Sequence, residues 1–236
     1  MRVAIVSDIH GNVHALEAVL ADLRDAAPDL ILHGGDLPHG GAHPAEVVDR
    51  IRDLGWPGVL GNTDEQLTAP ETLADFLGQT PALQPMSQAM GEMAAWTAEQ
   101  IGAERIEWLR GLPRVQRVEG VALVHARPED TWRSPGAEAS EEELEAAYGG
   151  LDGRVVVYGH IHVPYVRRVG GKIVANSGSV SLPLDGDRRA GYLLVDEGVA
   201  SIRRVEYDVQ RELRAVAGCG MPYSDWIGRV LETARP

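Results

Sequence analysis

The stretch Val3-Ala4-Ile5-Val6-Ser7-Asp8-Ile9-His10-Gly11-Asn12 decides how this 236-residue chain folds. It opens with four apolar, mostly β-branched residues, which is typical of a buried strand. Asp8 and His10 follow at once, and their spacing of two places both side chains on one side of an extended backbone. Because ligands of open α/β sheets bind at the carboxyl ends of strands, the stretch predicts a strand that delivers two metal-binding side chains to a site.

The same arrangement, an apolar run followed by polar residues, occurs four more times. The later polar segments are Gly34-Gly35-Asp36, Gly61-Asn62, His125 alone, and Gly159-His160-Ile161-His162. Imidazole, carboxylate and amide ligands without a thiolate suit Mn²⁺, Fe, Zn²⁺, Co²⁺ or Ni²⁺. Seven ligands are too many for one tetrahedral ion, so we expect two divalent transition-metal ions that share one ligand. A carboxylate is the usual bridge, which makes Asp36 the natural bridging candidate.

In this order, Asp-x-His, Gly-Asp, Gly-Asn, His and Gly-His-x-His resemble the motifs of the calcineurin-like metallophosphoesterase superfamily. In size the chain is similar to the small bacterial and archaeal phosphodiesterases of that superfamily. The resemblance covers residues 1 to about 200 and includes Asn176-Ser177-Gly178-Ser179-Val180. It implies a layered α/β fold, an αββα sandwich of two mixed β-sheets flanked by helices. It also implies a first metal held by Asp8, His10, Asp36 and His162, and a second held by Asp36, Asn62, His125 and His160.

The resemblance further implies hydrolysis of a phosphoester by a hydroxide that bridges the two ions. Two ions lower the pKa of the attacking water and neutralise the charge that develops on the phosphoryl oxygens. Asp36, Asn62 and His125 would then be catalytic as well as metal-binding residues. Manganese is the metal we expect first among the candidates, and a small phosphorylated molecule is the expected substrate.

One position departs from the family pattern. Many members carry Gly-Asn-His-Asp or Gly-Asn-His-Glu, in which the histidine stabilises the transition state or protonates the leaving group. This chain has Gly61-Asn62-Thr63-Asp64, and threonine does not titrate near neutral pH, so it cannot replace an imidazole acid. We therefore expect phosphodiesters or activated esters to be preferred over alkyl monoesters. The alternatives are a phosphomonoesterase, a dinucleotide polyphosphate hydrolase, or a catalytically weak metal-binding scaffold of the same fold. Asp64 itself is expected to cap a helix.

Three residues near these segments are candidates for substrate binding. Arg127, in the loop after the fourth segment, can clamp a phosphate oxygen through two guanidinium N–H groups, with an exposed loop arginine as the equal alternative. Asn12 can donate to substrate or to a ligand carboxylate, or it can cap the helix that follows. His39 and His43 lie in a glycine-rich loop, where either can supply the donor that Thr63 lacks.

Composition limits the class of protein. A formal net charge of −13 argues against general nucleic-acid binding, although bound cations still allow a phosphorylated substrate. Cys219 is the only cysteine, which excludes an intrachain disulfide and favours a reducing cytoplasm. No apolar run reaches the length of a membrane span, and Met1-Arg2 leads directly into a strand. We expect a cytoplasmic protein that does not enter a membrane; the sequence leaves the oligomeric state open.

The remaining patterns predict helices in the first half and hairpins in the second. Strands at 2–7, 30–33 and 59–60 with helices at 13–26 and 44–54 form a β-α-β-α-β unit. Residues 65–111 contain helical patterns at 70–77, 87–100 and 103–110, a helical insertion that could cap the site. Hairpins are predicted at 115–118 with 121–124, 165–169 with 172–175, and 192–195 with 201–207. A strand at 155–158 and helices at 140–148, 209–217 and 224–233 complete the pattern. The motifs spread through most of the chain, so residues 1–236 are predicted to form a single domain.

Overall fold

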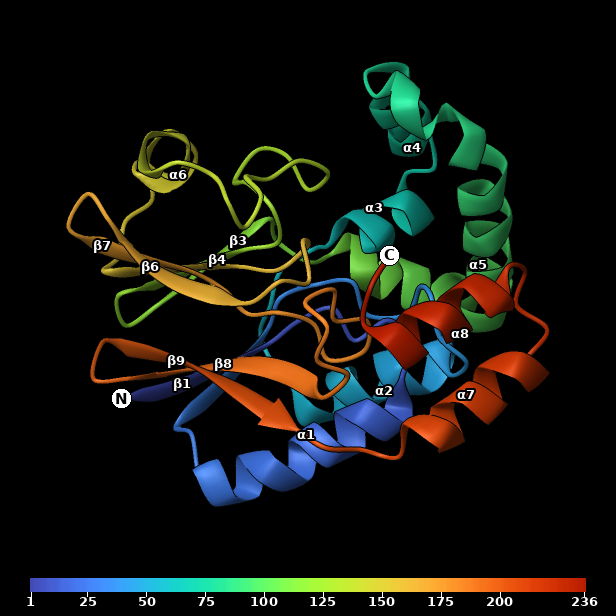
Figure 1. Ribbon diagram of the computed structural model, residues 1–236, viewed down its shortest axis with the longest axis horizontal. Helices are drawn as coiled ribbons and strands as arrows, with labels where there is room; N and C mark the ends of the chain where they lie inside the picture. The colour runs from blue at the N-terminus through green and yellow to red at the C-terminus, as the bar shows by residue number, and fades with distance from the viewer.

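The computed structural model describes residues 1–236 and places two β-sheets face to face with helices outside them (Figure 1). One sheet has the strand order β2-β1-β8-β9, with bounds β1 Arg2–Val6, β2 Leu30–His33, β8 Ala190–Asp196 and β9 Val199–Val205. The other has the order β3-β4-β5-β7-β6, with bounds β3 Val115–Val118, β4 Val121–Val124, β5 Val155–Tyr158, β6 Tyr165–Val169 and β7 Lys172–Asn176. Each sheet contains parallel and antiparallel pairs. The predicted sandwich of two mixed sheets is confirmed.

The space between the sheets is filled by alternate residues of the central strands. Val3 and Ile5 of β1 pack with Leu123 of β4 and Val157 of β5. The intervening residues of β1 face the opposite way, onto the helices. Both faces of β1 are therefore covered, which is why its sequence is continuously apolar instead of alternating.

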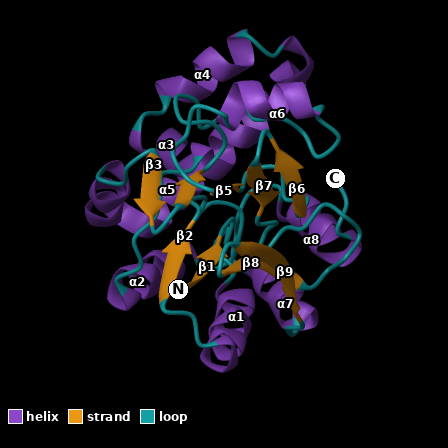
Figure 2. Ribbon diagram, turned by 90° about the vertical axis from the view of Figure 1, so that its left-hand side faces the viewer, coloured by secondary structure: helices purple, strands orange, loops and turns teal.

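Helices cover the outer face of each sheet (Figure 2). The helices are α1 Val13–Ala26, α2 Pro44–Leu54, α3 Asn62–Thr68, α4 Glu71–Gly78, α5 Ser87–Arg110, α6 Glu141–Tyr148, α7 Val209–Gly218 and α8 Ser224–Thr233, with a 3₁₀ helix η1 at Pro81–Met86. The predicted capping box opens α6: the Glu143 N–H donates to Ser140 Oγ at 3.2 Å, and the Ser140 N–H donates to Glu143 Oε2 at 2.7 Å. No helix combines the length and the apolarity needed to cross a bilayer.

Two local predictions are wrong. Residues 59–60 form no strand; Gly58 makes a single parallel bridge to His33. The Leu60 N–H donates to the Pro113 carbonyl at 2.9 Å, so pairing with β2 stops after one bridge. Helix α3 begins at Asn62, three residues before the start implied by the expected cap at Asp64. Its sequence Asn-Thr-Asp-Glu-Gln-Leu-Thr has one apolar residue and no helical periodicity to mark the start.

The helical segment from α3 to α5 packs against both the core and the loop that follows β4. Ile101 and Leu109 of α5 belong to the apolar cluster formed with α1 and α2. Gly102 has a φ of 71°, so the two patterns predicted at 87–100 and 103–110 are halves of α5 separated by a kink. Phe76 of α4 stacks on Trp132 at a ring-centroid distance of 4.9 Å. Helix α4 is thereby held against the loop that follows His125.

Candidate metal centre

The seven predicted ligands come together, although they are spread over 155 positions of the chain. Asp8 and His10 follow β1, Asp36 follows β2, His125 follows β4, and His160 and His162 follow β5. Asn62 is the first residue of α3. Six of the seven are buried and His160 is half-buried. The carboxyl ends of four strands thus meet as expected for an α/β ligand site.

Asp8, His10 and His162 form the first group. One ligand atom from each lies within 4.8 Å of the others. His162 Nε2 is 3.1 Å from His10 Nε2 and 3.2 Å from Asp8 Oδ1. Two imidazole nitrogens and a carboxylate oxygen pointing at one place are a suitable ligand set for a divalent transition metal.

Asn62, His125 and His160 form the second group beside Asp36. The Asn62 Oδ1 atom is 2.9 Å from His125 Nε2 and 2.9 Å from His160 Nδ1. His125 Nε2 is in turn 3.5 Å from Asp36 Oδ1. The second group therefore offers an amide oxygen, two ring nitrogens and a carboxylate oxygen, again without a thiolate.

Asp36 lies between the two groups. Its Oδ2 atom is 3.7 Å from His10 Nε2 in the first group, whereas Oδ1 faces His125 in the second. The Thr63 N–H donates to Oδ1 at 2.9 Å and fixes the orientation of the carboxylate. Each oxygen of Asp36 thus faces a different group, which is the arrangement that a bridging carboxylate requires.

Backbone carbonyls fix the tautomer of three histidines. The Nδ1 atoms of His10, His125 and His162 lie 2.6, 2.8 and 2.7 Å from the carbonyls of His39, Gly34 and Leu182. A carbonyl only accepts, so each Nδ1 carries the hydrogen and each Nε2 presents a lone pair to the cluster. A hydrogen bond from Nδ1 to a backbone carbonyl commonly orients an imidazole that binds a metal through Nε2.

The charge of the cluster favours cations. Asp8 and Asp36 are buried, and their only ion-pairing partners are histidines. Burial would raise the pKa of Asp8, but the neighbouring His162, His125 and His10 lower it below its ordinary value. Burial, with His125 adding to it, lowers the pKa of His160 to about 4, so this ring is neutral near pH 7. Two buried carboxylates without a lysine or arginine need another source of positive charge.

The backbone at the ligands is left-handed. Asp8, His10, Asp36, His160 and His162 have φ between 47° and 67°. For residues other than glycine this conformation costs about 1–2 kcal/mol each, and such residues concentrate at functional sites. The turn geometry aims consecutive polar side chains into one cluster at the end of a strand.

Two motif glycines provide space at the cluster. A Cβ atom on Gly61 would lie 2.1 Å from Asp36 Oδ1, and one on Gly159 would lie 2.4 Å from Asp8 Oδ2. Neither glycine has a positive φ. The Gly-Asn and Gly-His pairs therefore need glycine because ligand carboxylates pack directly against the backbone.

Asp64 is a site residue whose role the sequence did not reveal. It is not the N-cap of α3 but its third residue, since Gly61 is the N-cap. Its buried carboxylate accepts hydrogen bonds from the N–H groups of Asp36, Leu37 and Gly61 at 2.8, 3.0 and 2.9 Å. Asp64 thereby ties the Asp36 loop to the loop that carries Asn62. The acidic residue three positions after the N-cap was the available signal.

The substrate-binding candidates lie in different environments. Asn12 is fully buried; its Oδ1 accepts from the Ala15 N–H at 2.9 Å and its Nδ2 donates to Ser181 Oγ at 3.2 Å. Asn12 therefore caps α1, one of its two expected roles, and its contact with substrate stays a prediction. His39 is half-buried, with its ring 3.2 Å from Thr97 Oγ1, while its carbonyl orients His10. Arg127 is half-buried and its Nε atom has no hydrogen-bond partner.

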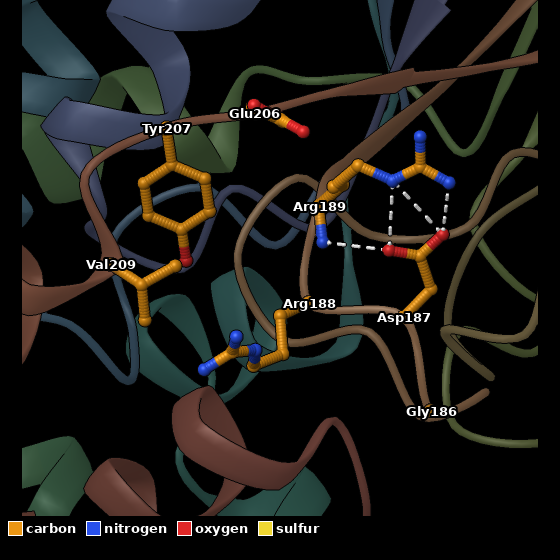
Figure 3. A pocket seen from close by; sticks show the side chains of 7 residues that line it. All are labelled: Gly186, Asp187, Arg188, Arg189, Glu206, Tyr207 and Val209. Atoms are coloured by element: carbon orange, nitrogen blue, oxygen red, sulfur yellow. Dashed lines mark hydrogen bonds and ion pairs between the residues drawn. The ribbon is translucent and has the colours of Figure 1, made fainter.

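One depression on the surface is lined by none of these residues. It has a volume of about 450 Å³ and is lined by Gly186, Asp187, Arg188, Arg189, Glu206, Tyr207 and Val209 (Figure 3). Arg189 turns toward Asp187, with its Nη2 2.6 Å from Asp187 Oδ2. The depression contains neither a histidine nor a buried carboxylate, so we assign the chemistry to the metal centre.

Comparisons with known proteins give one family model and several similar proteins. A family model described as the calcineurin-like phosphoesterase superfamily domain matches residues 1–198. An uncharacterized protein of Methanocaldococcus jannaschii, MJ0912, is 30% identical over 256 residues, spanning 99% of this chain and 98% of that protein. The phosphodiesterase YfcE of Escherichia coli is 26% identical over 212 residues, spanning 86% and 91%. The crystal structure of a metallophosphoesterase from Sphaerobacter thermophilus matches with a TM-score of 0.80 and 25% identity, covering 99% of this chain and 100% of that one.

Proposed function

This chain belongs to the calcineurin-like phosphoesterase superfamily, and from this premise we propose that it hydrolyses phosphodiester bonds of a small phosphorylated substrate with two divalent metal ions. The observation that carries the proposal is the position of Asp36, whose two oxygens face His10 and His125 in two different ligand groups. A structural metal site would need one closed ligand set, whereas two adjacent open sets suit hydrolysis.

The donor set fits the ions that the family implies. Two ions at this centre, when bound, supply a nucleophile by lowering the pKa of water and neutralise charge on the phosphoryl oxygens. We expect manganese first, with iron, zinc, cobalt and nickel as alternatives. Asp8, His10, Asp36 and His162 would hold the first ion, and Asp36, Asn62, His125 and His160 the second.

The side chains around the ligands limit the choice of substrate. Thr63 holds Asp36 through its backbone N–H, and its hydroxyl has no partner in the protein. A threonine hydroxyl can donate a hydrogen bond to a leaving group but cannot protonate an alkoxide near neutral pH. We therefore expect phosphodiesters, and esters with an activated leaving group, to be preferred over alkyl monoesters. Arg127 would bind a non-bridging phosphate oxygen through its guanidinium group.

We extend the proposal to the helical segment 65–111, which would cap the site within a single domain of residues 1–236. Phe76 of α4 stacks on Trp132, and Trp132 lies in the same loop as Arg127. The contact supports the proposal because movement of α4 would be transmitted to the loop that carries the phosphate-binding arginine.

The test compares substrates and variants of the purified protein. With Mn²⁺ added, we expect hydrolysis of bis(p-nitrophenyl) phosphate to exceed that of p-nitrophenyl phosphate, and two metal ions per chain by elemental analysis. Asp36→Asn should lower kcat/KM for the diester by more than about 100-fold, because both ions lose a ligand. The control is Asp187→Asn, which changes a carboxylate in the depression of Figure 3.

Each outcome decides one part of the proposal. Full activity of Asp36→Asn would refute the two-metal centre. A faster monoester reaction would refute the diester preference, and faster hydrolysis of a dinucleoside polyphosphate would identify that class as the substrate. Stoichiometric metal without any turnover would establish the scaffold alternative.

A further inference from the structure

Two histidines and a glutamate meet at a place that the proposed hydrolysis does not use. His14 lies in the first turn of α1, His43 directly precedes α2, and Glu212 lies on α7. In Figure 2, α1 lies between α2 and α7. One ring nitrogen of each histidine and a carboxylate oxygen of Glu212 all lie within 4.8 Å of one another. His43, which the sequence suggested as a donor at the metal centre, therefore belongs to a different cluster.

Within this cluster, some buried polar atoms have no hydrogen-bond partner. His14 Nδ1 is 2.6 Å from Glu212 Oε2, and the His14 and His43 rings meet edge to face at 5.0 Å. The Glu212 side chain is only 1% exposed, yet its Oε1 atom has no hydrogen-bond partner, and neither has His43 Nδ1. A hydrogen bond between His14 and Glu212 accounts for one pair of atoms only. The backbone N–H of Ala42 also approaches the Glu212 carboxylate, but Oε1 still has no partner at hydrogen-bond geometry.

The cluster opens onto a cavity that attracts cations. The cavity has a volume of about 410 Å³. Besides the cluster histidines, its lining includes the carboxylates of Glu17, Glu46 and Asp208 and one cation, Arg211. Glu17 also pairs with Arg50 at 2.8 Å, so the carboxylates, with Glu212, still outnumber the cations. This excess of negative charge favours divalent cations near the buried carboxylate of Glu212.

We propose that His14, His43 and Glu212 bind an additional divalent transition-metal ion, with Zn²⁺ as the best fit. Two imidazoles and a carboxylate are ligands that zinc accepts, and three protein ligands leave one coordination position open toward the cavity for water or a small anion. The ion gives the unmatched Glu212 oxygen and the His43 ring a common partner. It also links α7 to α1 and to the start of α2, three elements distant in sequence.

The ion would also support the loop of the metal centre. The His43 N–H donates to the Gly11 carbonyl at 2.9 Å, and Gly11 follows the ligand His10 directly. Fixing His43 therefore restrains the backbone beside His10 without contributing a ligand there. The inference itself rests on the three side chains and their cavity, and it stands independently of the reaction proposed above.

The test counts metal ions in matched variants. The full-length protein is stripped with a chelator, loaded with Zn²⁺, freed of loosely held metal by gel filtration, and analysed by elemental analysis. Glu212→Gln removes the charged ligand, and His43→Asn removes an imidazole while retaining a residue suited to the N-cap position. Glu17→Gln is the control, since it neutralises a carboxylate of the same cavity that lies outside the cluster.

We expect Glu212→Gln and His43→Asn each to hold one Zn²⁺ fewer per chain than the wild type, and Glu17→Gln to hold the same number. The melting temperature of the wild type should rise more on zinc addition than that of either variant. Equal zinc content in the wild type and in folded His43→Asn overturns the proposal. Because the test compares the zinc content of each variant with that of the wild type, its outcome does not depend on whether Asp36→Asn abolishes hydrolysis. Loss of turnover in Asp36→Asn with the difference intact separates the two sites.

Discussion

Replacing Asp64 by asparagine tests how the metal centre is held together. The Asp64 Oδ2 atom accepts from the N–H groups of Asp36 and Gly61, and Oδ1 accepts from that of Leu37. Asparagine turns one of these oxygens into an NH₂ group, which is itself a donor. The better orientation keeps the carbonyl at the Oδ2 position and leaves the buried Leu37 N–H facing another donor.

The loss can be estimated from those three bonds. A hydrogen bond to a charged acceptor contributes about 1.5–3 kcal/mol, and a buried donor left without a partner costs about 1–3 kcal/mol. These terms overlap, so we expect Asp64→Asn to lower the free energy of unfolding by about 2–4 kcal/mol. For a chain of this size that is a fall in Tm on the order of 10 °C. Because Asp64 positions both Asp36 and the Asn62 loop, kcat/KM should also fall, by about 100-fold for a displacement near 1 Å.

The free energy of unfolding without bound metal is measured by urea unfolding of chelator-treated protein, monitored by tryptophan fluorescence. The control is Asp208→Asn, because Asp208 caps α7 by accepting from the Arg211 N–H at 2.9 Å, and asparagine is an equivalent cap. Burial and the neighbouring Asp36 raise the pKa of Asp64 to about 7, whereas three N–H donors suit the charged form. If Asp64→Asn is as stable as Asp208→Asn, Asp64 carries a proton and the account of the three bonds is refuted.

Three further measurements test other parts of the structure. Burial lowers the pKa of His33 from 6.5 to about 4, so the unfolded chain binds the extra proton and the fold loses about 2 kcal/mol between pH 7.5 and pH 5. His33→Leu should remove that pH dependence of urea unfolding, and an unchanged dependence would contradict it. Ser140→Ala should cost about 1 kcal/mol in thermal unfolding through loss of the α6 cap; an unaltered Tm would show that the cap contributes nothing. Chelation should lower Tm and Mn²⁺ should restore it, and a Tm indifferent to both would count against metal binding.

The parts of the fold that follow from local physical chemistry could be predicted. Helix α1 begins after Asn12 and α2 ends before Gly55, whose φ is 64°, because caps and left-handed glycines are local signals. The hairpin β3–β4 follows from alternating runs around a tight turn. The seven candidate ligands could also be selected, since each lies within a few residues of the end of an apolar run that can be identified without knowledge of the partners.

Contacts between distant residues that no motif links could not be predicted. Residues 59–60 carry the signal of a strand, but the Leu60 N–H is taken by Pro113, 53 positions later. Asp64 binds backbone groups of a loop 28 positions earlier. His14 and Glu212 are 198 positions apart, and nothing in the sequence near either residue indicates the other. Such pairings depend on how the layers pack, which no local pattern encodes.

The left-handed ligand turns have a consequence for engineering. Glycine adopts that backbone without the steric cost that histidine pays, so changing His10 or His162 to glycine relieves strain as it removes a ligand. In the metal-free protein that relief offsets part of the packing and of the hydrogen bonds that each buried imidazole loses. A thermostability screen of the metal-free protein therefore only partly penalises the loss of a ligand, so every round should also select for catalysis.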